Sequence, residues 1–182
     1  RVLVMWSKPH PECAGRMLHE IAADWNQDIE AVIDHLEPAG AIYFDMDEND
    51  LQRILSYGPS MIGSDGLSGA DRPHPRLWGT FPRVLGRYVR EMPLLSMETA
   101  IRKMTGLSAE TFGLSDRGFL RPGYRADVVV FDPATVEDTA TFEVPEKPAS
   151  GICQVMVNGE LVLDQAKLTN ARPGRFLSRS NH

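Results

Sequence analysis

The stretch SMIGSDG, residues 60–66, decides how the rest of the chain is interpreted. Its short apolar run stops at Gly-Ser-Asp-Gly and predicts a buried strand over residues 60–63 that delivers one carboxylate, Asp65, to a loop. Loops at the C-terminal ends of strands carry the catalytic residues of α/β barrels. Taken alone, an Asp next to glycine is more often a turn residue, so the surrounding sequence has to decide between the two roles.

Composition and charge argue against several classes of partner. The 182 residues carry a formal net charge of −6 without a basic stripe, which argues against a nucleic-acid partner. No apolar run approaches the roughly 18 residues of a membrane span, so we expect no membrane partner. Cys13 and Cys153 lie far apart without metal-ligand spacing, which favours free thiols in a reducing cytoplasm. The chain opens at Arg1 on strand-like sequence without a signal-peptide pattern, so we expect a piece that begins inside a fold.

Strand and helix patterns alternate in the first part of the chain. The apolar run over residues 2–6 is typical of parallel strands that are buried on both faces. The order strand, helices, strand, helix, strand predicts an α/β layer that fits the closing units of a (β/α) barrel. Three strands cannot close a barrel, so we expect further strands upstream of Arg1. The predicted strands cover residues 2–6, 40–44 and 60–63, and the predicted helices begin near residues 12, 27, 47, 81, 96 and 108.

The sequence pattern changes near residue 118, where short β segments between turns begin. Asn158-Gly159, between two apolar runs, is the strongest hairpin signal in the chain. We therefore expect a helical, barrel-like part over residues 1–117 and a small β part over residues 118–182. The predicted β segments cover residues 118–120, 126–132, 152–157 and 160–163.

Several motifs together carry a family resemblance that covers nearly the whole chain. In this combination they resemble the C-terminal part of D-aminoacylases, the N-acyl-D-amino-acid deacylases of the amidohydrolase superfamily. The GYRADVVVFDP and VNG segments are common to many amidohydrolases, whereas the HPRLWG block points to the deacylase branch. The motifs are GSDG at 63–66, HPRLWG at 74–79, KMT at 103–105, GL at 113–114, DRG at 116–118, GYRADVVVFDP at 123–133 and VNG at 157–159.

The resemblance implies a fold and a reaction. The fold would be the last strands and helices of a TIM-like (β/α)8 metal-dependent hydrolase barrel over residues 1–117, followed by part of a small β-sandwich over residues 118–182. The reaction would be hydrolysis of an N-acyl-D-amino acid to a carboxylate and a free D-amino acid by a zinc-activated water. Asp65 would accept the proton of that water and pass it to the departing amine, as a general base and then a general acid.

Two further residues match substrate-binding positions of the family. Arg76 would hold the α-carboxylate of the substrate, because a guanidinium can bind a carboxylate with two parallel hydrogen bonds. Its alternative role is an ion pair with a surface acid. Met46 would line the pocket for the substrate side chain as a flexible apolar wall, and its alternative role is packing in the core.

The histidines offer no zinc site by their positions. His19 and His35 fall on predicted helices, His10 and His74 lie in loops, and His182 ends the chain. We therefore assign no metal ligand here and expect the zinc ligands in upstream sequence, since a zinc site needs three or four of them. The chain alone is then expected to be inactive.

Two alternatives stay open. One is another amidohydrolase reaction on a cyclic amide, such as that of a dihydroorotase or hydantoinase. The other is a non-catalytic fragment that packs against a partner supplying the remaining barrel, or that self-associates through exposed strand edges.

Overall fold

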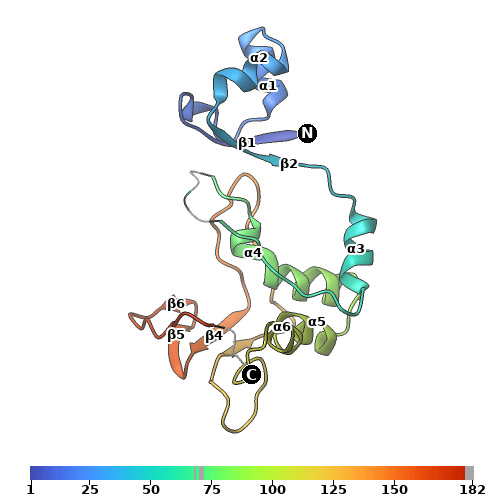
Figure 1. Ribbon diagram of the computed structural model, residues 1–182, viewed down its shortest axis with the longest axis vertical. Coiled ribbons are helices and arrows are strands. Elements are labelled where there is room, and N and C mark those ends of the chain that lie inside the picture. The colour runs from blue at the N-terminus through green and yellow to red at the C-terminus, as the bar shows by residue number, and fades with distance from the viewer. Residues whose placement is uncertain (68, 70–71, 179–182) are drawn as a thin grey trace. The chain divides into compact units, whose positions relative to one another are not determined.

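The computed structural model describes residues 1–67, 69 and 72–178 (Figure 1). Contacts divide the chain into two compact units. The first unit comprises residues 1–51, 64–78 and 140–148, and the second comprises residues 52–63, 79–139 and 149–182. Mixed helix and strand content makes this an α/β chain. Within the described residues, no helix combines the length and apolar character needed to cross a membrane.

The first unit is built on two paired strands covered by two helices. Leu18, Ile21 and Val32 point from the helices into a core shared with Val4 of the first strand. In Figure 1 the two helices lie together beside the strand pair. The elements are β1 (Val2–Ser7), the 3-10 helix η1 (Pro11–Cys13), α1 (Leu18–Trp25), α2 (Ile29–Leu36) and β2 (Ala39–Tyr43).

Parallel pairing of the first two strands was the sequence-based expectation, and it is wrong. β1 and β2 are antiparallel, with Val2 opposite Tyr43 and Ser7 opposite Ala39. Two helices separate the strands, as the sequence predicts, and the turn at Asn26 between these helices has a left-handed backbone with φ of 51°. The chain therefore returns to the end of β1 that it left, and β2 runs back along it.

The predicted helix from residue 12 begins later, at Leu18. Residues 15 and 16, which precede Leu18, form backbone hydrogen bonds with β1 instead. The Val4 N–H donates to the Arg16 carbonyl at 2.9 Å, and the Gly15 N–H donates to the Val4 carbonyl at 2.7 Å. The predicted helix from residue 27 is confirmed as α2, with the Asp28 side chain accepting the Ala31 N–H at 2.8 Å as its N-cap.

The second unit is mainly helical up to residue 112. Pro82 lies inside α4, and since proline has no N–H to donate, the regular helix gives way to a π-helix just after it. The core of this unit includes Val84, Leu85, Ala100 and Val136. α3 and α4 begin in the first unit and end in the second. The helices are α3 (Glu48–Ser56), α4 (Arg76–Arg83), the π-helix η2 (Val84–Glu91), α5 (Met97–Met104) and α6 (Gly106–Phe112).

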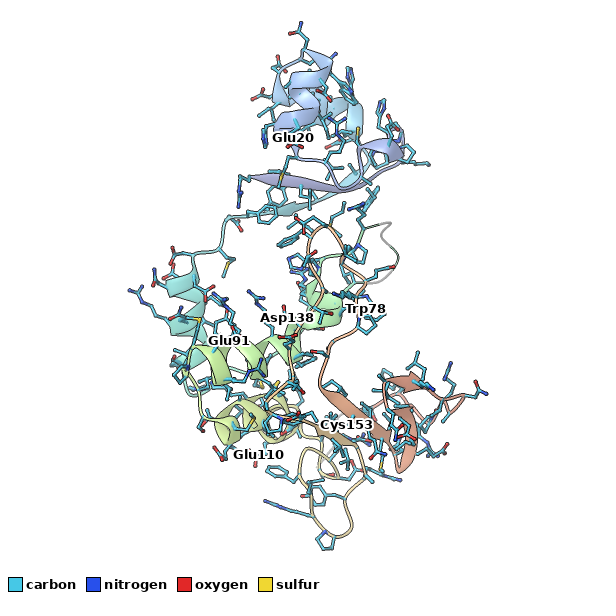
Figure 2. All side chains as sticks on the ribbon, turned by 180° about the vertical axis from the view of Figure 1, so that it is seen from behind. Glu20, Trp78, Glu91, Glu110, Asp138 and Cys153 are labelled. Carbon is cyan, nitrogen blue, oxygen red and sulfur yellow. The ribbon has the colours of Figure 1, made fainter. Side chains whose placement is uncertain are left out.

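Two arginines, Arg83 at the end of α4 and Arg90 on the π-helix, bind the segment after β3. Arg83 pairs with Asp138 at 2.9 Å, and Arg90 donates to the Val136 carbonyl at 2.6 Å (Asp138 is labelled in Figure 2). Gly86 makes the close approach possible, because a Cβ there would lie 2.8 Å from the Val136 carbonyl oxygen.

The C-terminal part of the second unit is a four-stranded antiparallel sheet in the order β3-β4-β5-β6. The predicted Asn158-Gly159 hairpin is confirmed: φ is 49° and 84° at these residues, and they join β4 to β5. The predicted β segment at residues 118–120 is not a strand. The strands are β3 (Val128–Phe131), β4 (Ile152–Val157), β5 (Glu160–Asp164) and β6 (Lys167–Leu168).

Residues 60–63, predicted to be a strand, have no regular structure. A strand needs a neighbouring strand for its backbone groups, and here the Ile62 N–H donates instead to the Lys103 carbonyl on α5, at 3.2 Å. The Lys103 ammonium donates to the carbonyls of Tyr57 at 2.6 Å, Gly58 at 3.3 Å and Ser60 at 3.0 Å, and to the Ser60 hydroxyl at 3.0 Å. Lys103 is 2% exposed, and this burial lowers the pKa of its ammonium group. The segment is thus held by one buried cation.

Replacing Lys103 with Met tests this anchor. The variant keeps a long apolar side chain but leaves the partly buried hydrogen bonds to Tyr57, Gly58 and Ser60 without their donor, so we expect a loss of unfolding free energy of about 1–3 kcal/mol. Chemical denaturation of the 182-residue chain measures it. The control is Lys167→Met, because Lys167 is exposed on β6 and its replacement should change little. Equal effects of the two substitutions would show that the Lys103 hydrogen bonds do not hold the segment.

Candidate active site

Asp65 and Arg76, the two residues singled out for catalysis and substrate binding, form an ion pair in the first unit. The Arg76 Nη2 lies 2.9 Å from the Asp65 Oδ2. The Asp65 side chain is 79% exposed and that of Arg76 is 40% exposed. A carboxylate and a guanidinium therefore meet at an open surface where a small molecule can reach both.

The loop after residue 63 brings the two side chains together. Asp65 has a left-handed backbone with φ of 46°, which turns the chain sharply at this point. Gly66 follows, and a Cβ there would lie 2.7 Å from Leu77 Cδ1 and 2.9 Å from Leu77 Cα. Only glycine lets the loop approach the first turn of α4 this closely, and Arg76 is the first residue of that helix.

His74 starts the turn that carries Arg76. Its Nδ1 accepts the Arg76 backbone N–H at 3.0 Å, and its carbonyl accepts the Leu77 N–H at 3.0 Å. The ring packs edge-on against Phe142 with 5.2 Å between centroids, and Phe142 packs against Phe44 at 4.8 Å. Side chains from three separate stretches of the first unit thus pack together, and one of them, His74, accepts a hydrogen bond from Arg76.

Burial lowers the pKa of the His74 imidazole, and the nearby Arg76 charge lowers it further, while Asp65 acts in the opposite direction. The ring is therefore neutral at neutral pH. Since Nδ1 accepts a hydrogen bond, the neutral ring carries its proton on Nε2.

Met46 lies between β2 and α3 with its side chain 69% exposed. Met46 is therefore not part of a core formed by the described residues. Its role as a wall of the substrate pocket stays a prediction.

The histidines and cysteines do not combine into a metal site within the described part of the chain. There, no group of three or more His, Cys, Asp or Glu side chains is arranged to hold a metal ion. His10 is engaged elsewhere, since its Nδ1 lies 2.9 Å from Glu12 Oε1 and its ring packs 4.8 Å from that of Trp25. Cys13 is a buried free thiol whose pKa is raised by burial. The described donor set therefore does not fit zinc by itself.

A cavity of about 310 Å³ lies in the second unit and is lined by none of the predicted site residues. Two charged residues of its lining, Arg125 and Asp116, pair with each other at 3.0 Å, and Arg117 of the lining pairs at 2.6 Å with Asp127 outside it. The carboxylate in its lining, that of Asp116, accepts hydrogen bonds from both Arg117 and Arg125. The candidate active site is therefore the exposed pair rather than this cavity.

The sequence did not predict that His74 and Phe142 support Arg76 in this site. The sequence predicts only a loop position for His74, whereas its ring nitrogen accepts the backbone N–H of Arg76. The spacing of two residues from His74 to Arg76, just before a helix, is the available signal, since side chains at such positions accept backbone N–H groups. Phe142 gives no comparable signal.

Chemically, the pair combines a proton acceptor with an anion-binding group. A carboxylate of Asp65 can take a proton from water and return it. The guanidinium of Arg76 can bind a second carboxylate in place of Asp65. A substrate with its own carboxylate next to a bond to be hydrolysed would engage both.

Comparisons with known proteins identify the family. The model of the amidohydrolase family matches residues 19–163. The chain is 57% identical over 180 residues to a D-aminoacylase and 54% identical over 178 residues to an N-acyl-D-glutamate deacylase, both from Alcaligenes xylosoxydans xylosoxydans. These matches cover 99% and 98% of this chain but only 37% and 36% of the two relatives, so the chain spans little more than a third of their length.

A solved structure agrees with these matches. It is the N-acyl-D-glutamate deacylase of Bordetella bronchiseptica, complexed with zinc and a phosphonate inhibitor that mimics the tetrahedral intermediate of the reaction. The TM-score is 0.93 at 51% identity, over 98% of this chain and 37% of that one. The resemblance to D-aminoacylases predicted from the motifs is thereby confirmed, and the chain belongs to the amidohydrolase family.

Proposed function

We propose that the chain forms part of an enzyme that hydrolyses N-acyl-D-amino acids to a carboxylate and a free D-amino acid. The observation that carries the proposal is the convergence of Asp65 and Arg76, 2.9 Å apart at an exposed site. The relatives named D-aminoacylase and N-acyl-D-glutamate deacylase support the choice of substrate class.

In the proposed reaction Arg76 binds the α-carboxylate of the substrate. It must exchange its partner to do so, because without substrate it pairs with Asp65. The released Asp65 carboxylate then takes a proton from the attacking water as the new C–O bond forms. It gives that proton to the amine nitrogen as the C–N bond breaks. Zinc is present in the Bordetella complex, and the described residues of this chain do not hold it alone.

The surroundings of this pair are proposed from the family resemblance. We propose that residues 1–117 form the C-terminal portion of a TIM-like barrel and that residues 118–182 form the C-terminal part of a small β-sandwich. Residues 68, 70, 71 and 179–182 of these ranges lie outside the described part. Met46 would form an apolar wall for the substrate side chain. The free thiols Cys13 and Cys153 support a cytoplasmic location.

A chimera tests the activity. In it, this chain replaces the matched 37% of the Alcaligenes D-aminoacylase. We expect hydrolysis of N-acetyl-D-amino acids and no hydrolysis of hydantoins. A folded chimera with the opposite preference would support the cyclic-amide alternative. The 182-residue chain alone is expected to bind no stoichiometric zinc, by plasma emission spectrometry, and to be inactive.

Asp65→Asn in the chimera tests the proton transfer. The amide cannot accept a proton from water, so we expect kcat to fall by about three orders of magnitude or more while substrate still binds. Steady-state kinetics measure the change. Asp34→Asn is the control, because Asp34 is exposed on α2. If Asp65→Asn retained a tenth of the parent rate, another group would be the base.

Arg76→Lys tests the carboxylate contact. Lysine keeps the charge but cannot make two parallel hydrogen bonds, so binding of an N-acetyl-D-amino acid should weaken by about 1 kcal/mol, the contribution of one hydrogen bond. The matched control is the same substrate with its carboxylate converted to an amide, which should be insensitive to the substitution. Equal losses of affinity for both substrates would show that Arg76 does not recognise the carboxylate.

A further inference from the structure

The His74 side chain contacts the candidate site at the backbone N–H of Arg76. Its Nδ1 accepts the Arg76 N–H at 3.0 Å. This N–H belongs to the first residue of α4, where helical N–H groups have no partner within the helix. The hydrogen bond therefore fixes the position from which the guanidinium of Arg76 extends.

The imidazole is itself held in place. Its ring packs edge-on against Phe142, at 5.2 Å between centroids, and Phe142 packs on Phe44 at 4.8 Å. These contacts come from the stretches around residues 44 and 142, far from residue 74 in sequence. Because packing against Phe142 already restricts the ring, the hydrogen bond from Arg76 to Nδ1 costs little additional side-chain entropy.

Only the neutral ring can serve this purpose, because a protonated Nδ1 is a donor and cannot accept the N–H. The neighbours of His74 favour the neutral form. Burial lowers its pKa first and the Arg76 charge lowers it further, while the Asp65 carboxylate raises it. Arg76 and Asp65 are the charged groups that act on the ring, and the 140–148 stretch presents the apolar Phe142 to it.

We propose that His74 is a positioning residue for Arg76: its unprotonated imidazole holds the first turn of α4 so that the guanidinium can receive the α-carboxylate of the substrate. The inference rests on the proposed function, because it takes Arg76 to be the carboxylate-binding group. It assigns to His74 no contact with substrate and no part in proton transfer.

Two substitutions separate the hydrogen bond from the packing. His74→Asn places an oxygen acceptor at the same branch as Nδ1 but removes the ring, whereas His74→Phe keeps a ring against Phe142 but removes the acceptor. In the chimera, KM for an N-acetyl-D-amino acid should rise about fivefold in His74→Phe, the worth of one ordinary hydrogen bond, with kcat nearly unchanged. His74→Asn should restore KM, and the amidated substrate should respond to neither.

The pH dependence provides a second readout. Since the folded pKa of His74 is lowered, the positioning is complete above the ordinary histidine value of about 6.5 and is lost as pH falls through the lower folded value. The parent KM should therefore rise on the acid side, below pH of about 6.5. His74→Asn has no titrating ring, so that rise should be absent.

Nuclear magnetic resonance on the 182-residue chain tests the geometry without activity. At neutral pH the His74 Nδ1 should carry no proton, and the Arg76 amide should be protected from hydrogen exchange. Protection should be lost in His74→Phe and kept in His74→Asn. A protonated Nδ1, or an Arg76 amide that exchanges equally in all three, would overturn the inference. If these resonance results hold but the chimera shows no deacylase activity, the proposed function fails while the positioning contact stands.

Discussion

The proposed site depends on the ion pair between Arg76 and Asp65. The exposure of this pair determines how strongly the two side chains hold each other. Both side chains reach solvent, so the pair adds little to stability and is screened by salt. A weak pair is an exchangeable one: a substrate carboxylate has only to replace an equivalent partner on Arg76. A deeply buried pair would hold Asp65 against that exchange. The surrounding loop is held instead by the close approach of Gly66 to Leu77 and by the hydrogen bond from Arg76 to His74.

Local signals in the sequence predicted local structure correctly. Helices were expected to begin near residues 27, 47 and 96, and at each of these starts a side chain accepts a backbone N–H, from Ala31 to Asp28, from Asn49 to Asp47 and from Thr99 to Ser96. The Asn158-Gly159 turn was predicted for the same reason. Helix caps and hairpin turns depend on a few adjacent residues, so the local sequence is enough to predict them.

Features that depend on distant partners could not be predicted in this way. An apolar run does not state which strand pairs with it, so β1 and β2 were expected to be parallel and are antiparallel. Residues 60–63 had the apolar pattern of a strand, but their backbone groups meet Lys103 instead. At the site, family resemblance singled out Asp65 and Arg76, whereas the support from Phe142 arises from a contact with no trace in sequence spacing.

Binding of an unreactive carboxylate tests the exchange at Arg76 most directly. An analogue in which CH2 replaces the amide N–H has no C–N bond to hydrolyse and no amine charge, so calorimetry can compare its affinity for the chimera in a double-mutant cycle of Asp65→Asn and Arg76→Gln. Removing the Asp65 charge frees Arg76, so the account predicts tighter binding in Asp65→Asn and no such gain when Arg76 is already replaced. Unchanged or weaker binding in Asp65→Asn would contradict it.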